Sequence, residues 1–268
     1  MISVLDHGLV TGDGVFESVL VQHGRTFALR RHLERLERSA AIIGLVPPPR
    51  EEVEAAVRAV LAAAGLPSAK VRITVTAGRG PLGSLRHAVP PSLIVAAAPL
   101  EIPGSPGLGA ARERTGASVA VVPWPRNERS PLAGAKTISY VENVLAVAWA
   151  TDRGASEALF ANLAGHLCEG TGSNVFVVHG GQLLTPPLQA GCLAGVTRAL
   201  VIELTGASEA NLEVERLREV TEAFLTSTTR GVQPIGMIDG VALPDCPGPV
   251  TKGALAAYDE LLASTTEP

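Results

Sequence analysis

Short strand-like and helix-like segments follow one another along the whole chain, and Gly or Pro ends most of them. Residues 15–21 have the β-branched and apolar content of a strand. Residues 30–43 and 50–64 carry apolar side chains at three- and four-residue spacing, the pattern of amphipathic helices. A strand near 212–215 and a short helix over 217–223 are also expected. Because strands and helices mix throughout, the sequence predicts an α+β or α/β fold with two lobes.

Residues 101–116 are rich in Gly, Pro and Arg and show little periodicity, which is typical of a linker. We therefore expect two lobes with a linker between them, the larger lobe carrying Lys136. The expected divisions are a small N-terminal α/β lobe over 1–105, an interdomain linker over 106–116 and a C-terminal lobe over 117–268.

Charge and cysteine content limit the classes of function. The net charge is −4 and acids and bases are mixed along the 268 residues, which gives no footprint for nucleic acid or an anionic membrane. Three scattered cysteines are too few for a disulfide framework or a thiolate zinc site, so no metal is expected. No signal peptide follows Met1 and no apolar run reaches spanning length, so a cytoplasmic protein is expected.

Lys136 is the first candidate for chemistry. Only three of the 22 basic residues are Lys, at positions 70, 136 and 252, and the rest are Arg, which cannot form an imine. Lys136 follows small residues and precedes an expected helix. An amine that loses hydration there would have a lowered pKa and become nucleophilic. The alternative is an ordinary solvated lysine on a loop.

Two turns and a helix start provide further candidates. Glu169 ends a short expected strand and could pair with the protonated nitrogen of a cofactor ring, or it could be a plain turn acid. Thr197 begins an apolar helix, where backbone N–H groups form an anion site or the hydroxyl simply caps the helix. The hydroxyl-rich turn over 227–231 could close the same anion site.

Two arginines and a histidine are weaker candidates. Arg35 lies on a charged helix face, where it could bind phosphate or form ordinary ion pairs with its neighbours. Arg86 and His87 lie in a long Gly- and Pro-rich loop and could bind a substrate carboxylate, or the loop could simply be exposed. Taken together, the candidates require a ligand with a phosphate, a ring nitrogen and an aldehyde, which is pyridoxal 5′-phosphate (PLP).

Several motifs, in order along nearly the whole chain, resemble those of the class IV aminotransferases, the fold-type IV PLP enzymes. That family includes branched-chain aminotransferases, D-amino acid aminotransferases and 4-amino-4-deoxychorismate lyases. The motifs occupy residues 6–8, 12–17, 31–36, 136–140, 168–176, 193–198 and 226–229.

The resemblance implies a two-lobed, D-amino acid aminotransferase-like fold, a homodimer and a PLP cofactor. It implies that Lys136 forms the Schiff base and moves the proton, and that Glu169 pairs with the pyridine nitrogen. The other cofactor-binding positions it implies are Arg35, Ser173, Asn174, Val196, Thr197 and Thr228. The substrate-binding positions are Phe16, Arg86, His87 and Thr229.

The function implied is transfer of an amino group between an amino acid and a keto acid, both small molecules. One alternative is 4-amino-4-deoxychorismate lyase, which produces 4-aminobenzoate and pyruvate, and a second is a PLP-binding protein without catalysis. Branched-chain members carry Tyr where Val141 stands and Arg shortly after the position of Glu17. Phe16 and the segment 230–234 look closer to the lyase-like branch.

Overall fold

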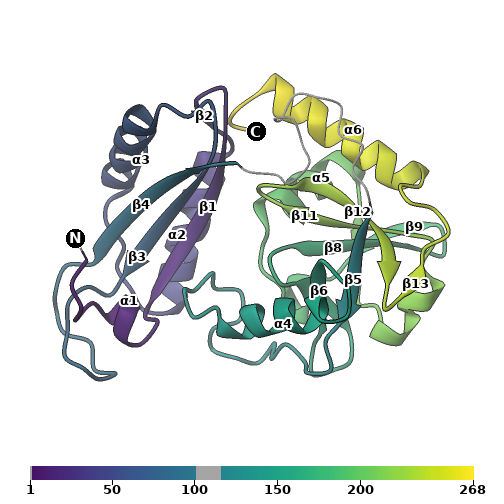
Figure 1. The fold of residues 1–268 in the computed structure, drawn as a ribbon, viewed down its shortest axis with the longest axis horizontal. Helices are drawn as coiled ribbons and strands as arrows, with labels where there is room; N and C mark the ends of the chain where they lie inside the picture. Colours follow the sequence, from purple (N-terminus) through teal and green to yellow (C-terminus); the bar gives the residue numbers. More distant parts are fainter. Residues whose placement is uncertain (1, 101–115) are drawn as a thin grey trace. The chain divides into compact units, whose positions relative to one another are not determined.

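The computed structural model describes residues 2–100 and 116–268 (Figure 1). The linker expected over 106–116 lies, apart from Gly116, outside the described residues, as does the end of the lobe expected over 1–105. The chain divides into two compact units. Unit 1 comprises Met1–Arg112, Ala135–Tyr140 and Glu267, and unit 2 comprises Glu113–Gly134, Val141–Thr266 and Pro268.

Unit 1 is built on a four-stranded antiparallel sheet with the strand order β2-β1-β3-β4. Its elements are α1 His7–Val10, β1 Gly14–Gln22, β2 Arg25–Thr26, α2 Leu29–Ile42, α3 Arg50–Ala64, β3 Ser68–Thr76 and β4 Ser92–Pro99. Helix α2 packs on β1, and α3 packs on β3 and β4. The helices expected over 30–43 and 50–64 are confirmed as α2 and α3.

Side-chain alternation gives the sheet of unit 1 two different faces. Val15 and Val19 of β1 pair with Val75 and Val71 of β3, and these four lie in one core with apolar residues of α2 and α3. Phe16, between them in sequence, therefore points to the opposite face. β1 thus presents one face to the helices and the other to the groups around Phe16.

The segment Ala135–Tyr140 is grouped with unit 1, whereas the sequence places Lys136 in the C-terminal lobe. The physical reason is backbone pairing with β1. The Phe16 N–H donates to the Lys136 carbonyl at 2.9 Å, and the Ile138 N–H donates to the Gly14 carbonyl at 3.0 Å. These bonds add the segment to the edge of the sheet and give the backbone of Lys136 a rigid support.

Unit 2 contains a larger mixed sheet with the order β10-β9-β8-β11-β12-β5-β6-β7, and β13 pairs with β12. The strands β5, β6 and β12 run parallel to one another. The elements are β5 Ala117–Val121, α4 Val141–Thr151, β6 Glu157–Ala161, β7 Leu167–Gly170, β8 Asn174–His179, β9 Gln182–Thr185, η1 Leu188–Ala190, α5 Val196–Thr205, β10 Ser208–Glu209, η2 Val214–Glu219, β11 Glu222–Ser227, β12 Gly231–Ile238, β13 Val241–Ala242 and α6 Pro249–Ser264.

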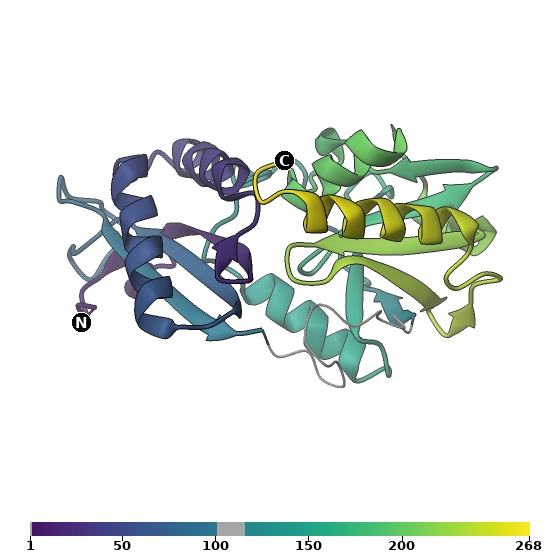
Figure 2. The ribbon, with the colours of Figure 1, turned by 90° about the horizontal axis from the view of Figure 1, so that it is seen from above.

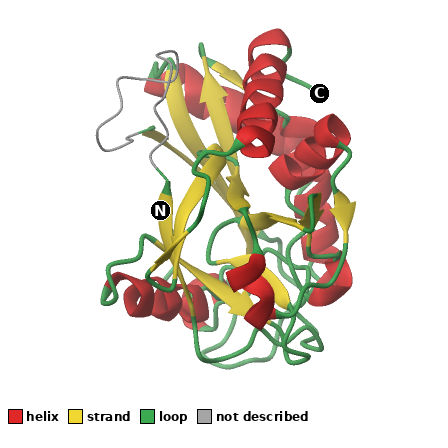
Figure 3. Cartoon of the chain, turned by 90° about the vertical axis from the view of Figure 1, so that its right-hand side faces the viewer, coloured by secondary structure: helices red, strands yellow, loops and turns green. Residues whose placement is uncertain are grey.

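Helices cover the sheet of unit 2. Helix α6 lies along β11 and β12 and contacts α5, as Figure 2 shows, while α4 packs on β5 and β6. Small residues of α4, Ala146 and Ala150, allow close approach to Phe160 of β6. Strands and helices are interspersed in both units (Figure 3), which confirms the predicted fold class.

The strand expected near 212–215 is wrong. Residues 214–219 form the 3₁₀ helix η2, and Glu213 makes only an isolated bridge to His166. The helix expected over 217–223 is also wrong, because η2 ends at Glu219 and the strand β11 begins at Glu222. Val214 and Leu217 both pack in the apolar core of unit 2, and their three-residue spacing places them on one side of a 3₁₀ turn. Burial of this pair explains the difference, because a strand would direct the two side chains to opposite faces.

Candidate active site

The backbone of Lys136 is fixed on two sides within unit 1. Its carbonyl accepts from Phe16 of β1, and its N–H donates to the Ser39 hydroxyl of α2 at 3.0 Å. Thr137 makes an isolated antiparallel bridge with Val15. The lysine therefore extends from a strand-like edge that is tied to the core, and not from a solvated loop.

The amine of Lys136 lies beside aromatic rings. Its Nζ is 4.5 Å from the centroid of Phe16 and 5.8 Å from that of Tyr140, and the two rings meet edge to face at 5.4 Å. The guanidinium of Arg72 stacks on Phe16 with its Cζ at 3.7 Å. Both cations gain from the ring quadrupole, and together they form a positively charged cluster.

Tyr140 and Arg72 were not singled out by the sequence. Arg72 lies on β3 opposite Ser18, two positions from the partner of Phe16, so the two side chains are diagonal neighbours on one face. That relation depends on the register between β1 and β3. Tyr140 follows Lys136 by four residues and carried a weak signal as the one aromatic residue near the lysine.

On the helix-covered face of unit 1, Glu17 pairs with Arg35 in the core. Arg35 donates from Nε and Nη2 to the two carboxylate oxygens at 2.7 Å each, and His32 Nδ1 lies 2.8 Å from the same carboxylate. Burial raises the pKa of Glu17, but Arg35 and His32 outweigh it and hold the pKa well below its usual range. Arg35 as a phosphate contact stays a prediction.

In unit 2, Glu169 is anchored at the end of β7. Its Oε2 accepts from the Leu193 N–H at 2.9 Å, and its Oε1 lies 3.6 Å from Arg126 Nε. Arg126 also pairs with Glu142 and stacks on the ring of Phe160 at 4.0 Å. The Glu169 carboxylate is thus fixed in position beside a positive charge. Arg126 was missed because nothing near it in sequence distinguishes it.

Ser173 and Asn174 support the loops around Glu169. The Ser173 hydroxyl donates to Glu157 at 3.2 Å, and Asn174 Nδ2 donates to the Leu193 carbonyl at 2.8 Å. A Cβ at Gly195 would lie 2.0 Å from Asn174 Oδ1, so this close approach requires glycine. These hydrogen bonds fix the loop that leads into α5. Direct contact of either residue with a cofactor stays a prediction.

The N-terminus of α5 has the features of an anion site. Gly195 is its N-cap and provides no side-chain cap, so Thr197 does not act as the cap that the alternative interpretation required. Val196 and Thr197 are buried. Backbone N–H groups of a first turn without a side-chain cap favour an anion. Thr228 and Thr229 lie half-buried in the turn between β11 and β12.

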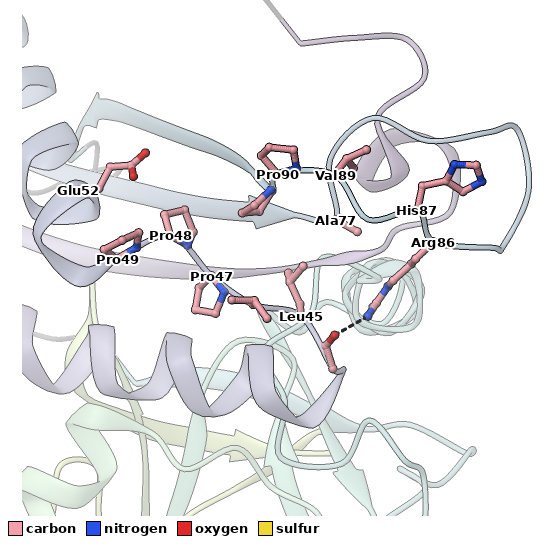
Figure 4. A pocket seen from close by; sticks show the side chains of 13 residues that line it. Leu45, Pro47, Pro48, Pro49, Glu52, Ala77, Arg86, His87, Val89 and Pro90 are labelled. Carbon is pink, nitrogen blue, oxygen red and sulfur yellow. Dashed lines mark hydrogen bonds between the residues drawn. The ribbon is translucent and has the colours of Figure 1, made fainter.

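Arg86 and His87 line a pocket of about 510 Å³ in unit 1, together with a run of prolines (Figure 4). Arg86 Nε donates to Asp13 at 2.6 Å, and its Nη1 donates to the carbonyls of Ile43 and Gly44. The arginine therefore anchors the loop. Substrate binding by Arg86 and His87 stays a prediction, because no other predicted site residue lines this pocket.

No group of three or more His, Cys, Asp or Glu within 2–100 and 116–268 could hold a metal ion. Over the same ranges, no helix combines the length and apolar character needed to cross a membrane.

Comparison with known proteins identifies the family. The family model "Amino-transferase class IV" matches residues 14–238. A putative branched-chain-amino-acid aminotransferase of Methanocaldococcus jannaschii is 35% identical over 249 residues, which cover 89% of this chain and 83% of that protein.

Two solved structures are also similar. The branched-chain amino acid aminotransferase of Escherichia coli superposes with a TM-score of 0.88 at 29% identity and covers 97% of this chain and 89% of its own. A hypothetical aminotransferase of Mycobacterium tuberculosis in its PLP-bound form superposes with a TM-score of 0.83 at 27% identity. That match covers 98% of this chain and 93% of the other. The chain therefore belongs to the class IV aminotransferases and is a PLP-dependent enzyme that moves an amino group between an amino acid and a keto acid.

Proposed function

We propose that Lys136 is the amine that bonds to PLP and that Glu169 pairs with the pyridine nitrogen. The observation that carries the proposal is the position of Lys136 Nζ beside Phe16 and Tyr140, on a backbone fixed to β1. An amine, an anchored carboxylate and a helix N-terminus without a side-chain cap are the partners that an aldehyde, a ring nitrogen and a phosphate need. The proposed phosphate contacts are Arg35, Val196, Thr197 and Thr228.

The chain's own groups then have defined tasks. PLP, when bound, supplies an aldehyde that condenses with amines and a ring that takes up electrons. The Lys136 amine would accept the proton from the substrate Cα and return it later. Glu169 supplies a negative charge that keeps the ring nitrogen protonated. The anchoring of Glu169 by Leu193 and Arg126 keeps that carboxylate in place during the reaction.

The proposed substrate is an aliphatic amino acid with a branched side chain, with 2-oxoglutarate as the amino acceptor. Relatives named for branched-chain amino acids support this choice. Arg72 supports carboxylate recognition, because its guanidinium stacks on the same ring as Lys136 Nζ and forms no ion pair with a described residue. Phe16 and Tyr140 provide apolar surface beside it.

Borohydride reduction tests the assignment of the lysine. Purified protein with PLP is expected to show an absorbance band near the visible edge that disappears on reduction. Mass spectrometry of the digest should then locate the pyridoxyl group on Lys136. Lys70 and Lys252, both exposed, serve as internal controls and should stay unmodified. A label on either of them in place of Lys136 would contradict the proposal.

A substrate panel separates the proposed activity from the alternatives. Valine, leucine and isoleucine with 2-oxoglutarate should give the highest kcat/KM among L- and D-amino acids. Release of 4-aminobenzoate from aminodeoxychorismate without a keto acid would instead support the lyase. A PLP band with no turnover of any substrate would support a non-catalytic binding protein.

We also propose that the chain forms a homodimer through α4. Val141, Val144 and Leu145 are 71%, 62% and 58% exposed, and the last two lie three and four residues after Val141, on the same side of the helix. An exposed apolar stripe of this kind marks a protein interface. A second copy of the chain is the partner that the resemblance implies. A cytoplasmic location completes the proposal, since the three cysteines at 168, 192 and 246 are all free thiols.

Replacing Val144 by Asp is expected to produce monomers. A charge in an apolar interface weakens association by roughly 100-fold or more, as the loss of a central contact does. Sedimentation at micromolar concentration measures the change. Val241→Asp is the matched control, because Val241 is 66% exposed on a separate hairpin. Unchanged association in Val144→Asp would exclude α4 from the interface.

A further inference from the structure

The carboxylate of Glu157, at the start of β6, binds the turn that follows Glu169. Its Oε1 accepts from the Thr171 hydroxyl at 2.7 Å, the Gly172 N–H at 2.9 Å and the Ser173 hydroxyl at 3.2 Å. Glu157 is only 5% exposed. Three donors on one buried, charged oxygen make strong hydrogen bonds, so the turn has a single defined conformation.

The second oxygen of Glu157 binds a different turn. Arg230 Nη1 lies 2.7 Å from Oε2, and Arg230 Nε donates to the Ser227 hydroxyl at 3.2 Å. Arg230 belongs to the turn between β11 and β12 that carries Thr228 and Thr229. One carboxylate therefore joins two turns that are far apart in sequence, and both contain predicted cofactor or substrate contacts.

The positive charge of Arg230 keeps the buried Glu157 ionised. Burial raises the pKa of Glu157, but the positive charge of Arg230 and the hydrogen bonds from Thr171 and Gly172 outweigh it, so the pKa lies below its usual range. Glu157 is therefore ionised at neutral pH. Removing Arg230 would leave a buried carboxylate without its charge partner, which favours rearrangement of the groups around it.

We infer that the ion pair between Glu157 and Arg230 is a positioning element that aligns the turn bearing Thr228 for the cofactor phosphate. The inference rests on the proposed function, in which Glu169 and Thr228 bind opposite ends of PLP. A hydroxyl on a turn contributes fully to phosphate binding only when the turn is already in the bound geometry. Arg230 is a positioning residue here, because it acts through Thr228.

The test compares PLP with pyridoxal, which has the same ring and aldehyde but no phosphate. Arg230→Met removes the charge and keeps most of the stem. We expect it to weaken PLP binding to the apoprotein roughly tenfold, the size of one lost charge-assisted hydrogen bond, and pyridoxal binding much less. Arg230→Lys should restore part of the PLP affinity. The ³¹P chemical shift of bound PLP should also change in Arg230→Met.

The control is Arg216→Met, because Arg216 forms an exposed ion pair with Glu219 in the same unit. It should leave both affinities unchanged. Equal loss of PLP and pyridoxal binding in Arg230→Met would show a merely structural role and overturn the inference, as would an unchanged PLP affinity. If the native protein bound neither compound, the proposed function itself would fail, which is a different result.

Should Arg230→Met fail to fold, the pair Arg230→Lys and Glu157→Gln decides the matter. Glu157→Gln keeps acceptors for the donors of Thr171 and Gly172 but loses the charge that attracts Arg230. We expect Glu157→Gln to lower the ratio of PLP affinity to pyridoxal affinity, with little further loss when Arg230→Lys is added. Independent, additive losses would contradict the coupling of the two turns.

Discussion

Replacing Lys136 by Arg is expected to lower transamination by about 10³-fold or more. The guanidinium stays protonated, so it can neither bond to an aldehyde nor accept a proton from carbon. It keeps the positive charge beside Phe16 and Tyr140, and the backbone bonds to β1 and Ser39 are unaffected by the side chain. The fold should therefore survive. Single-turnover assays with an amino donor measure the loss.

Lys70→Arg and Lys252→Arg are matched controls for this variant. Both lysines are exposed, one on β3 and one on α6, and the chemical change is the same. Each control should keep full activity and the PLP absorbance band, whereas Lys136→Arg should lose the band. Turnover in Lys136→Arg above a tenth of the native value would remove Lys136 from the reaction.

Local structure was predictable where local sequence determines it. The helix over 50–64 follows from its apolar spacing, with a proline run before it and Gly65, at positive φ, after it. Strand β1 follows from its β-branched content. The error at 212–215 arose because a short apolar pattern fits either a strand or a 3₁₀ turn, and packing of both Val214 and Leu217 in the core decides between them.

Contacts over long sequence separation could not be predicted. Glu17 and Arg35 looked like parts of separate motifs, and their pairing depends on how α2 lies against β1. Glu157 and Arg230 are 73 positions apart and meet only because β6, which begins at Glu157, lies in the same sheet as β11 and β12, whose connecting turn carries Arg230. The sequence identified the types of residue at the site, but the partners that fix those residues follow from strand register and helix packing.

The packing of α2 on β1, which pairs Arg35 with Glu17, leads to the largest expected effect on stability. Glu17→Gln should lower the free energy of unfolding by about 3–5 kcal/mol, because it leaves the buried Arg35 without a charge partner. Glu17 is fully buried and Arg35 is 4% exposed. Hydrogen exchange of the amides in β1 and β3 measures the effect within unit 1, without the assumption that both units unfold together.

The half-buried pair of Glu37 and Arg50 provides a matched control. Arg50 Nε and Nη2 donate to the two Glu37 oxygens at 3.0 and 2.8 Å, the same two-point geometry as Arg35 and Glu17. The two pairs differ mainly in burial. Glu37→Gln should therefore cost less than about 1 kcal/mol. Equal losses in the two Gln variants would show that geometry, and not burial, sets the strength of these pairs.

Two further measurements test the electrostatic explanation for Glu17. The pKa of folded Glu17 lies far below the unfolded value of 4.5, so its contribution is complete above pH 4.5 and is lost as the pH falls toward the folded pKa. The stability difference between native protein and Glu17→Gln should therefore shrink below pH 4.5. A double variant, Glu17→Met with Arg35→Leu, should be more stable than Glu17→Gln, because no charge is left unpaired in the core. The electrostatic explanation would be wrong if the stability difference between native protein and Glu17→Gln did not change with pH and the losses of the two single changes simply added in the double variant. Packing alone would then account for the stability.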